Sequence, residues 1–197
     1  MDITLLKVNK PFSEYEKYLP FATEERLEKI KSLKCEHDKA LSLLSHLLAR
    51  CEVSKAMGIP FEAVVFSYNE HGKPYVEKEN YHFSISHSGN LIAFVSHTSP
   101  IGIDLQKITG GISPAVRFFT ENEKCYIKND TERFFEVWTK KEAYIKMLGT
   151  GLSKPLSSFD VLTESVRNML FSTSSDNYSI SVCAENLPKI NIRTQCV

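Results

Sequence analysis

The sequence predicts an α+β fold of layered α/β type, built from two similar halves. Two observations predict it. In each half a helical stretch precedes a series of strand-forming segments, although no internal sequence repeat accompanies this order. Apolar residues keep helical spacing over residues 36–57 and 131–148, whereas β-rich runs joined by short turns dominate between the two. We expect a seam near residues 97–100, which divides the chain into residues 1–98 and 99–197.

The first half is expected to begin with a strand at residues 3–8. Thr23 followed by acidic residues is typical of a helix start, because a threonine side chain can accept from the free amides of the first turn. The main helix is predicted over residues 36–57, with Gly58 and Pro60 as its stop signal. Further strands are expected at residues 63–68, 81–86, 91–97 and 100–105, and turns at residues 69–74 and 88–90.

The second half is expected to start with helix-capping sequences. Ser113 precedes a proline, and Thr120 with Glu123 fits a capping box, in which each residue satisfies an amide of the other. A long helix is predicted over residues 131–148, ending at Gly149. The strands expected after it lie at residues 159–162, 166–171, 178–184 and 190–193.

The bulk composition is that of an ordinary globular protein, with 42% hydrophobic and 24% charged residues. The 24 Lys and Arg balance 24 Asp and Glu, so overall charge favours neither a nucleic-acid partner nor a membrane surface. The five cysteines are odd in number and scattered, which indicates reduced thiols. With no secretory signal and no apolar run of membrane-spanning length, we expect a cytoplasmic location.

The strand predicted near residues 101–106 presents one carboxylate. Because side chains alternate along a strand, Asp104 shares a face with Gly102 and Gln106, while the isoleucines and leucine face the core. Asp104 and Gln106 offer hard oxygen ligands, and Gly102 would let a ligand approach the backbone. The alternative is a strand end with a solvated aspartate.

On the helix predicted at residues 131–148, Trp138, Glu142 and Lys146 follow each other at intervals of four along one stripe. Glu142 and Lys146 therefore present a carboxylate and an ammonium one turn apart. The alternative is a surface ion pair beside a core tryptophan, worth a few tenths of a kcal/mol. Brought beside Asp104, however, this stripe predicts a site for a hard divalent cation and a phosphorylated ligand.

Two further segments carry groups suited to phosphate. In the segment at residues 82–89, Ser84 and Ser86 share a strand face and His87 follows at the strand end. Lys73 lies between a glycine and a proline, in a rigid turn. The alternatives are a turn histidine and a solvated lysine, each without a task.

Taken together, these segments resemble one known family. The motifs GKP, FSISHSG, IGIDLQK, RFFTENE and FFEVWTKKEAYIKMLGTGL follow each other as in the 4′-phosphopantetheinyl transferases, in their surfactin-synthetase-activating branch. The resemblance extends from about Arg26 to Val161. It implies two α/β halves related by a pseudo-twofold axis. It also implies Mg²⁺-dependent transfer of the phosphopantetheine arm of coenzyme A to a serine of an apo acyl or peptidyl carrier protein (holo-[acyl-carrier-protein] synthase activity), releasing adenosine 3′,5′-bisphosphate.

The resemblance also implies residue roles. Asp104 and Glu142 would hold the magnesium, with Gln106 contributing weakly or through water. Glu142 and Lys146 would be catalytic, Glu142 as the base for the acceptor serine, directly or through water, and Lys146 at the leaving group. The residues implied in binding coenzyme A are Arg26, Lys29, Lys73, Ser86, His87 and Lys146.

Two positions depart from the family pattern, since Gln106 replaces a third acidic ligand and Leu41 replaces an arginine of close relatives. They leave open a catalytically weakened carrier-protein or coenzyme A binding module. A generic nucleotide-binding protein and a structural protein without a site are further alternatives. We expect a monomer. The carrier could serve fatty-acid, polyketide or non-ribosomal peptide synthesis, and could dock on residues 111–130, which include Arg117, Phe118, Phe119 and Lys124.

Overall fold

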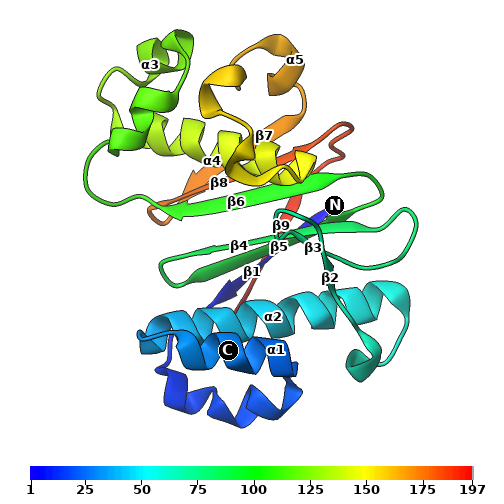
Figure 1. Ribbon diagram of the computed structural model, residues 1–197. Coiled ribbons are helices and arrows are strands. Elements are labelled where there is room, and N and C mark those ends of the chain that lie inside the picture. Colours follow the sequence, from blue (N-terminus) through cyan, green and yellow to red (C-terminus); the bar gives the residue numbers. More distant parts are fainter. Residues whose placement is uncertain (197) are drawn as a thin grey trace.

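Two β-sheets are stacked between two groups of helices in the computed structural model, which describes residues 1–196 apart from the side chain of Leu152 (Figure 1). The first sheet has the strand order β4-β5-β1-β9, and the second has the order β6-β8-β7, while β2 and β3 form a small separate sheet of their own. Helices α1 and α2 cover the first sheet, and α3, α4 and α5 lie over the second. The predicted α+β class is confirmed by this arrangement.

Local sequence signals place the elements of the first half. Thr23 caps α1 by accepting from the amide of Arg26, and α2 ends at Gly58 in the left-handed conformation, as predicted. The elements are β1 (Asp2–Lys7), α1 (Glu24–Ser32), α2 (Glu36–Met57), β2 (Ser67–Tyr68), β3 (Pro74–Tyr75), β4 (His82–Ser88) and β5 (Leu91–His97). Short 3-10 helices span Phe12–Glu14, Glu16–Phe21 and Phe61–Ala63.

The second half has its predicted helix starts. The capping box of Thr120 and Glu123 is present at α3, and α4 ends at Gly149. The elements are β6 (Ile101–Lys107), α3 (Glu121–Ile127), α4 (Thr131–Leu148), α5 (Glu164–Arg167), β7 (Leu170–Ser175), β8 (Tyr178–Ala184) and β9 (Asn191–Cys196). Short 3-10 helices span Pro114–Phe118, Gly151–Ser153 and Leu156–Ser158.

Three strand predictions are wrong over all or part of their length. Residues 63–68 form a strand only at 67–68, and the buried Arg50 binds the carbonyls of Phe61 and Glu62 just before them. Residues 159–162 form no strand, because the amide of Val161 donates to Glu123. Residues 166–171 begin as helix α5, and β7 starts only at residue 170.

The last strand crosses back to the first sheet. Strand β9 pairs in parallel with β1, so that Asp2 lies opposite Asn191 and Lys7 opposite Cys196. The proposed division into residues 1–98 and 99–197 remains a prediction. Strand β9 belongs by sequence to residues 99–197, but it pairs with the sheet formed by residues 1–98.

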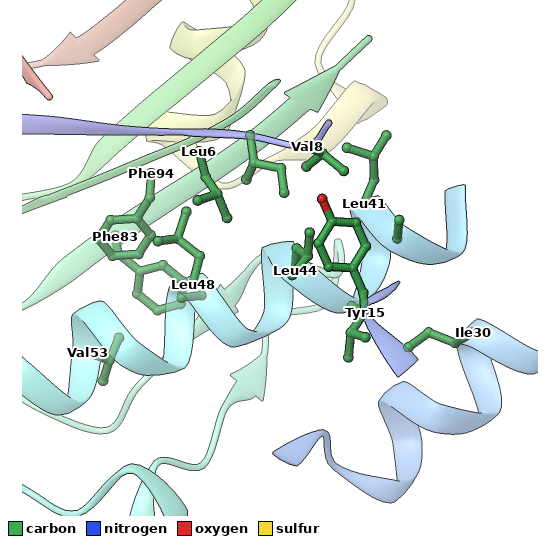
Figure 2. Close-up of a cluster of buried hydrophobic side chains, with 14 of the residues drawn as sticks. Leu6, Val8, Tyr15, Ile30, Leu41, Leu44, Leu48, Val53, Phe83 and Phe94 are labelled. Atoms are coloured by element: carbon green, nitrogen blue, oxygen red, sulfur yellow. The ribbon is translucent and has the colours of Figure 1, made fainter. Parts of the chain in front are cut away.

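Separate apolar cores hold the layers together. Between α2 and the first sheet, side chains of β1, β4 and β5 and of the residue after β1 pack against the helix (Figure 2). This core includes Leu6, Val8, Phe83 and Phe94 from the sheet side and Leu41, Leu44, Leu48 and Val53 from α2. Between the two sheets, β1 and β5 pack against β6 and β8 through Ile3, Leu5, Val95, Ile101, Ile103 and Val182. Among the described residues no helix combines the length and apolar character of a membrane span.

The two sheets meet at their edge strands, β4 and β6. Serines of β4 bridge them: Ser84 Oγ accepts from the amide of Ile103 at 3.1 Å, and Ser88 Oγ accepts from that of Lys107 at 3.0 Å. We call these two strands and their serine contacts the serine seam. It fixes the height of β6 against β4 and so positions the polar side chains that both strands carry.

Candidate functional site

A cleft of about 460 Å³ opens where the two halves meet. Its volume lies within the range of small-molecule sites. Helices α1 and α2 form one end, and β4, β6 and α4 form the other. The predicted site residues that line it are Arg26, Lys29, Ser86, His87, Asp104, Gln106, Glu142 and Lys146. Residues far apart in the sequence are therefore gathered as the sequence predicted, apart from Lys73.

Asp104 is the buried acidic group of the cleft, with 2% of its surface exposed. Its Oδ1 accepts from Lys146 Nζ at 2.7 Å and from Ser86 Oγ at 2.8 Å. Lys146 Nζ also lies 3.0 Å from Ser86 Oγ, so the three groups form a closed triangle. Charge-assisted hydrogen bonds of this kind are strong, so they hold the carboxylate in place. They also compensate for its burial, since a buried carboxylate without partners would strongly destabilise the fold.

Gly102 shares the strand face of Asp104, but it faces a helix. A Cβ at this position would overlap the carbonyl oxygen of Ala143 and the amide of Met147, both in the backbone of α4. The expectation that Gly102 admits a ligand is therefore wrong. Its missing side chain lets α4 lie directly on β6, which brings Glu142 and Lys146 up to Asp104.

Glu142 is half-buried in the same cleft. Burial, and then the negative charge of Asp104, raise the pKa of its carboxyl, while Lys146 acts in the opposite direction. Two carboxylates in one cleft repel each other, and a bound cation would relieve that repulsion. The pair therefore fits a divalent cation that accepts oxygen ligands.

The cationic groups lie on both sides of these carboxylates. Lys146 lies beside Asp104, next to His87, whose pKa is lowered by burial and by the charges of Lys146 and Lys29. At the α1 end, Arg26 Nη1 donates to Ser42 Oγ at 3.2 Å. The cleft thus offers positive charge at two separated places with two carboxylates near one of them, which suits a ligand bearing more than one phosphate.

Comparison with known proteins agrees with this geometry. The family model of the 4′-phosphopantetheinyl transferase superfamily matches residues 100–194, and that of the 4′-phosphopantetheinyl transferase N-terminal region matches residues 10–99. A 4′-phosphopantetheinyl transferase of Bacillus subtilis is 34% identical over 170 residues, covering 82% of this chain and 76% of that protein.

The chain belongs to the 4′-phosphopantetheinyl transferase family. Other relatives carry the same name. The protein gsp of Aneurinibacillus migulanus is 39% identical over 128 residues, or 62% of this chain and 54% of that protein. Sfp of Bacillus subtilis strain 168 is 33% identical over 170 residues, or 82% of this chain and 76% of that protein.

In this transferase Gln106 is engaged with its neighbours. Its Oε1 accepts from Ser88 Oγ at 3.2 Å, and its Nε2 lies 3.5 Å from Asp104 Oδ2. The amide therefore turns a donor toward the carboxylate. Within residues 1–196 no three His, Cys, Asp or Glu side chains form a metal-binding group. A cation held by Asp104 and Glu142 would need water and substrate oxygens to complete its shell.

Lys73 lies outside the main cleft. Its Nζ donates to the carbonyl of Ile101 at 3.0 Å and to that of Lys146, which ties the β2–β3 turn to β6 and to α4. Burial and the charge of Lys146 lower its pKa to about 8. Lys73 lines a smaller cavity of about 290 Å³ that shares Glu142 and Lys146 with the cleft. Its predicted contact with a coenzyme A phosphate stays a prediction.

A buried ion pair behind the site was missed by sequence reasoning. Lys141 and Glu123 are fully buried and lie 2.8 Å apart. Lys141 also donates to the carbonyls of Leu156 and Phe159, so it ties the chain after α4 to α3. The signal was present, because Lys141 falls one helical turn from both Val137 and Ile145, on the buried face of α4.

The remaining residues of interest differ in whether they line the cleft. Trp138 packs against Phe119 and Phe134 and at the same time lines the cleft, so it serves both core and site. Leu41 lies on the face of α2 that is buried in the core, and it is not among the residues that line the cleft. The cleft also contains Ser45 and His46 of α2, which the sequence gave no reason to select.

Proposed function

We propose that this chain transfers the 4′-phosphopantetheine arm of coenzyme A to a serine of an apo carrier protein in a Mg²⁺-dependent reaction that releases adenosine 3′,5′-bisphosphate. The observation that carries the proposal is the meeting of Asp104, Glu142 and Lys146, from β6 and α4, in a single cleft with cationic groups at both ends. Family membership supports the same reaction.

The polar and cationic groups of the cleft contact different parts of coenzyme A. Ser86, His87 and Lys146 hold the pyrophosphate, and Arg26 and Lys29 hold the adenosine end. Lys73 is retained as a coenzyme A contact from the wall of the smaller cavity. That contact requires its ammonium to exchange a backbone carbonyl for a phosphate oxygen.

The residues present fit a magnesium ion. Asp104 and Glu142 would hold it, and Gln106 would take part only weakly or through water, since its amide now faces Ser88 and Asp104. When bound, the ion supplies positive charge that neutralises the pyrophosphate.

Two side chains of this protein, Glu142 and Lys146, act on the proton of the acceptor serine and on the leaving group. Glu142 takes the proton of the acceptor serine, directly or through a water molecule, while the serine oxygen forms a bond to the β-phosphorus. The bond from that phosphorus to the bridging oxygen breaks, and adenosine 3′,5′-bisphosphate leaves with the electron pair. Lys146, held in place by Asp104 and Ser86, stabilises or protonates the departing oxygen.

The partner is proposed to be an apo acyl or peptidyl carrier protein, with the transferase acting as a cytoplasmic monomer. Phe118 is 50% exposed and lies under the guanidinium of Arg117, 4.7 Å from ring centroid to Cζ, which offers an apolar and cationic contact for an acidic carrier. Phe119 is 2% exposed and belongs to the core, so it is removed from the proposed docking area. Lys124 pairs with Glu121 at 2.8 Å.

A transfer assay tests the proposal. The protein, coenzyme A and several apo carriers are incubated with and without Mg²⁺, and mass spectrometry measures the carriers. We expect the mass of one phosphopantetheine arm to be added only with Mg²⁺ and to disappear with Asp104→Asn. Binding of coenzyme A without transfer to any carrier would instead favour the weakened binding module, for which the neutral Gln106 is the supporting observation.

A further inference from the structure

The hairpin of β2 and β3 contributes to the wall of the cleft from the first half of the chain. Its two strands form a small sheet of their own, in which Ser67 lies opposite Tyr75. The hairpin residues that line the cleft are Tyr68, Gly72 and Pro74. A two-stranded hairpin has little stability of its own in water, so its position depends on the contacts that its turn makes.

The turn of this hairpin, residues 69–73, is organised by the side chain of Asn69. Asn69 Oδ1 accepts from the amide of His71 at 3.0 Å and from that of Lys73 at 2.9 Å. The backbone of Asn69 closes the same turn, since its amide donates to the carbonyl of Lys73 at 3.0 Å. An asparagine that binds its own backbone in this way stabilises the turn.

The other end of the same side chain binds the end of α4. Asn69 Nδ2 donates to the carbonyl of Gly149 at 2.8 Å. A Cβ on Gly149 would lie 3.2 Å from this nitrogen, so the missing side chain lets the amide approach. The orientation of the amide follows from its partners, because both partners of Oδ1 are donors and the partner of Nδ2 is an acceptor. Asn69 therefore joins a turn of the first half to a helix of the second.

This bond supports the last turn of α4, which carries Lys146. The last carbonyls of a helix have no partner within it and carry partial negative charge. Lys73 Nζ binds the carbonyl of Lys146, and Asn69 binds that of Gly149, so the hairpin turn holds the end of α4 at two places. In the proposed function Lys73 gives up a carbonyl to reach a phosphate. The bond of Asn69 then still holds the hairpin against α4.

We propose that Asn69 is a positioning residue of the transfer reaction, which acts through Lys146. By holding the end of α4, it keeps Lys146 Nζ 2.7 Å from Asp104 Oδ1 and so at the leaving group. Asn69 is not among the described residues that line the cleft or the smaller cavity, so its effect passes through its neighbours. This inference rests on the proposed function, which gives Lys146 its task.

Two variants remove the bond to α4 and leave an acceptor for the hairpin turn. Asn69→Asp turns a second oxygen toward the carbonyl of Gly149, and Asn69→Ser has a hydroxyl too short to reach it. We expect both to fold in urea titrations and to lower kcat by about 10–100-fold, as for a displaced catalytic group, while calorimetry finds an affinity for adenosine 3′,5′-bisphosphate within about two-fold of the wild type. Asn168→Asp, at an exposed position after α5, is the control and should change neither quantity.

A double-mutant cycle tests whether the effect passes through Lys146. Asn69→Ser is combined with Lys146→Met, and single turnovers are followed with the protein in excess over an apo carrier. Because the task of Asn69 is to place Lys146, we expect no further loss of rate in that background. Equal fold losses in both backgrounds, or a loss of nucleotide affinity with kcat unchanged, would overturn the inference.

A spectroscopic measurement does not depend on residual activity. In nuclear magnetic resonance spectra of protein with isotope-labelled lysine, the side-chain signals of Lys146 should differ between the wild type and Asn69→Ser. Those of the exposed Lys31 on α1 should not. An unchanged Lys146 signal overturns the role of Asn69 but leaves the proposed function intact if the wild type transfers the arm. A wild type that transfers nothing to any carrier removes both proposals.

Discussion

At the scale of single residues, the proposed mechanism depends on Glu142 as the base for the acceptor serine. Glu142→Gln keeps the shape of the side chain but removes the proton acceptor. We expect the fold to be retained and the rate of transfer to fall by about 10²–10⁴-fold, the usual contribution of a general base. The rate is measured with a labelled arm and an apo carrier. Glu132→Gln, on the exposed first turn of α4, is the matched control. Near-normal turnover of Glu142→Gln would remove this residue from the mechanism.

Gln106 tests the metal site at the same scale. Gln106→Glu would place a third carboxylate beside Asp104, and the added negative charge should favour a divalent cation. We therefore expect half-maximal activity at a lower Mg²⁺ concentration. A titration of activity with Mg²⁺ checks this. If the curve does not move, position 106 lies outside the coordination shell, and its contact with Ser88 is purely structural.

At the scale of elements, the contact between β6 and α4 decides where the proposed catalytic groups lie. Gly102→Ala should destabilise the protein by about 1–3 kcal/mol, because the new methyl group meets the backbone of α4. It should also slow transfer by displacing Glu142. Urea denaturation measures the stability. Gly111→Ala is the control, since a Cβ there meets nothing within 4 Å. Equal stability of the two variants would contradict the close packing of this helix.

The buried ion pair of α3 and α4 gives a second prediction for elements. Lys141→Met leaves Glu123 charged, buried and without its cation, so we expect a loss of about 3–5 kcal/mol in the free energy of unfolding. Lys140→Met, at the neighbouring position, removes only the pair with Glu136 near the surface and should lose about 0–1 kcal/mol. Thermal or urea unfolding of both variants provides the comparison. Similar losses would show that Lys141 contributes by packing alone.

At the scale of the whole molecule, the serine seam joins the two sheets. Ser84→Ala leaves the buried amide of Ile103 without its acceptor, and we expect a loss of about 1–3 kcal/mol in the free energy of unfolding. Ser174→Ala, at an exposed position of β7, should change stability little. Unfolding followed by urea titration measures both. A negligible effect of Ser84→Ala would mean that the apolar core between the sheets holds the halves together unaided.

The sequence predicts the parts of this fold that depend on local chemistry. The bounds of α2 and α4 follow from apolar spacing and from Gly58 and Gly149, which end the helices within the same stretch of chain. Most of residues 63–68 and all of residues 159–162 were predicted wrongly. Side chains from other elements, Arg50 of α2 and Glu123 of α3, bind the backbone in or beside these segments, and periodicity along the chain does not reveal such contacts.

In the candidate site, too, local sequence patterns indicate some residues but not the contacts between distant segments. Asp104, Glu142 and Lys146 were selected from strand and helix spacing, but only the resemblance to a family brought them together. The two carbonyls that hold Lys73 and the carbonyl that binds Asn69 depend on contacts between distant segments, so no local pattern could reveal them.

One wall of the cleft comes from the first half of the chain and the other from the second half, so a bound molecule couples the stability of the two halves. A molecule that contacts Arg26 on α1 and Lys146 on α4 at once would stabilise the folded chain, because it is released whenever the two halves separate. Each ten-fold rise in its concentration above the dissociation constant would add about 1.4 kcal/mol against unfolding. A short fragment that contacts only one wall would stabilise only that half, so the other half could still unfold or separate from it.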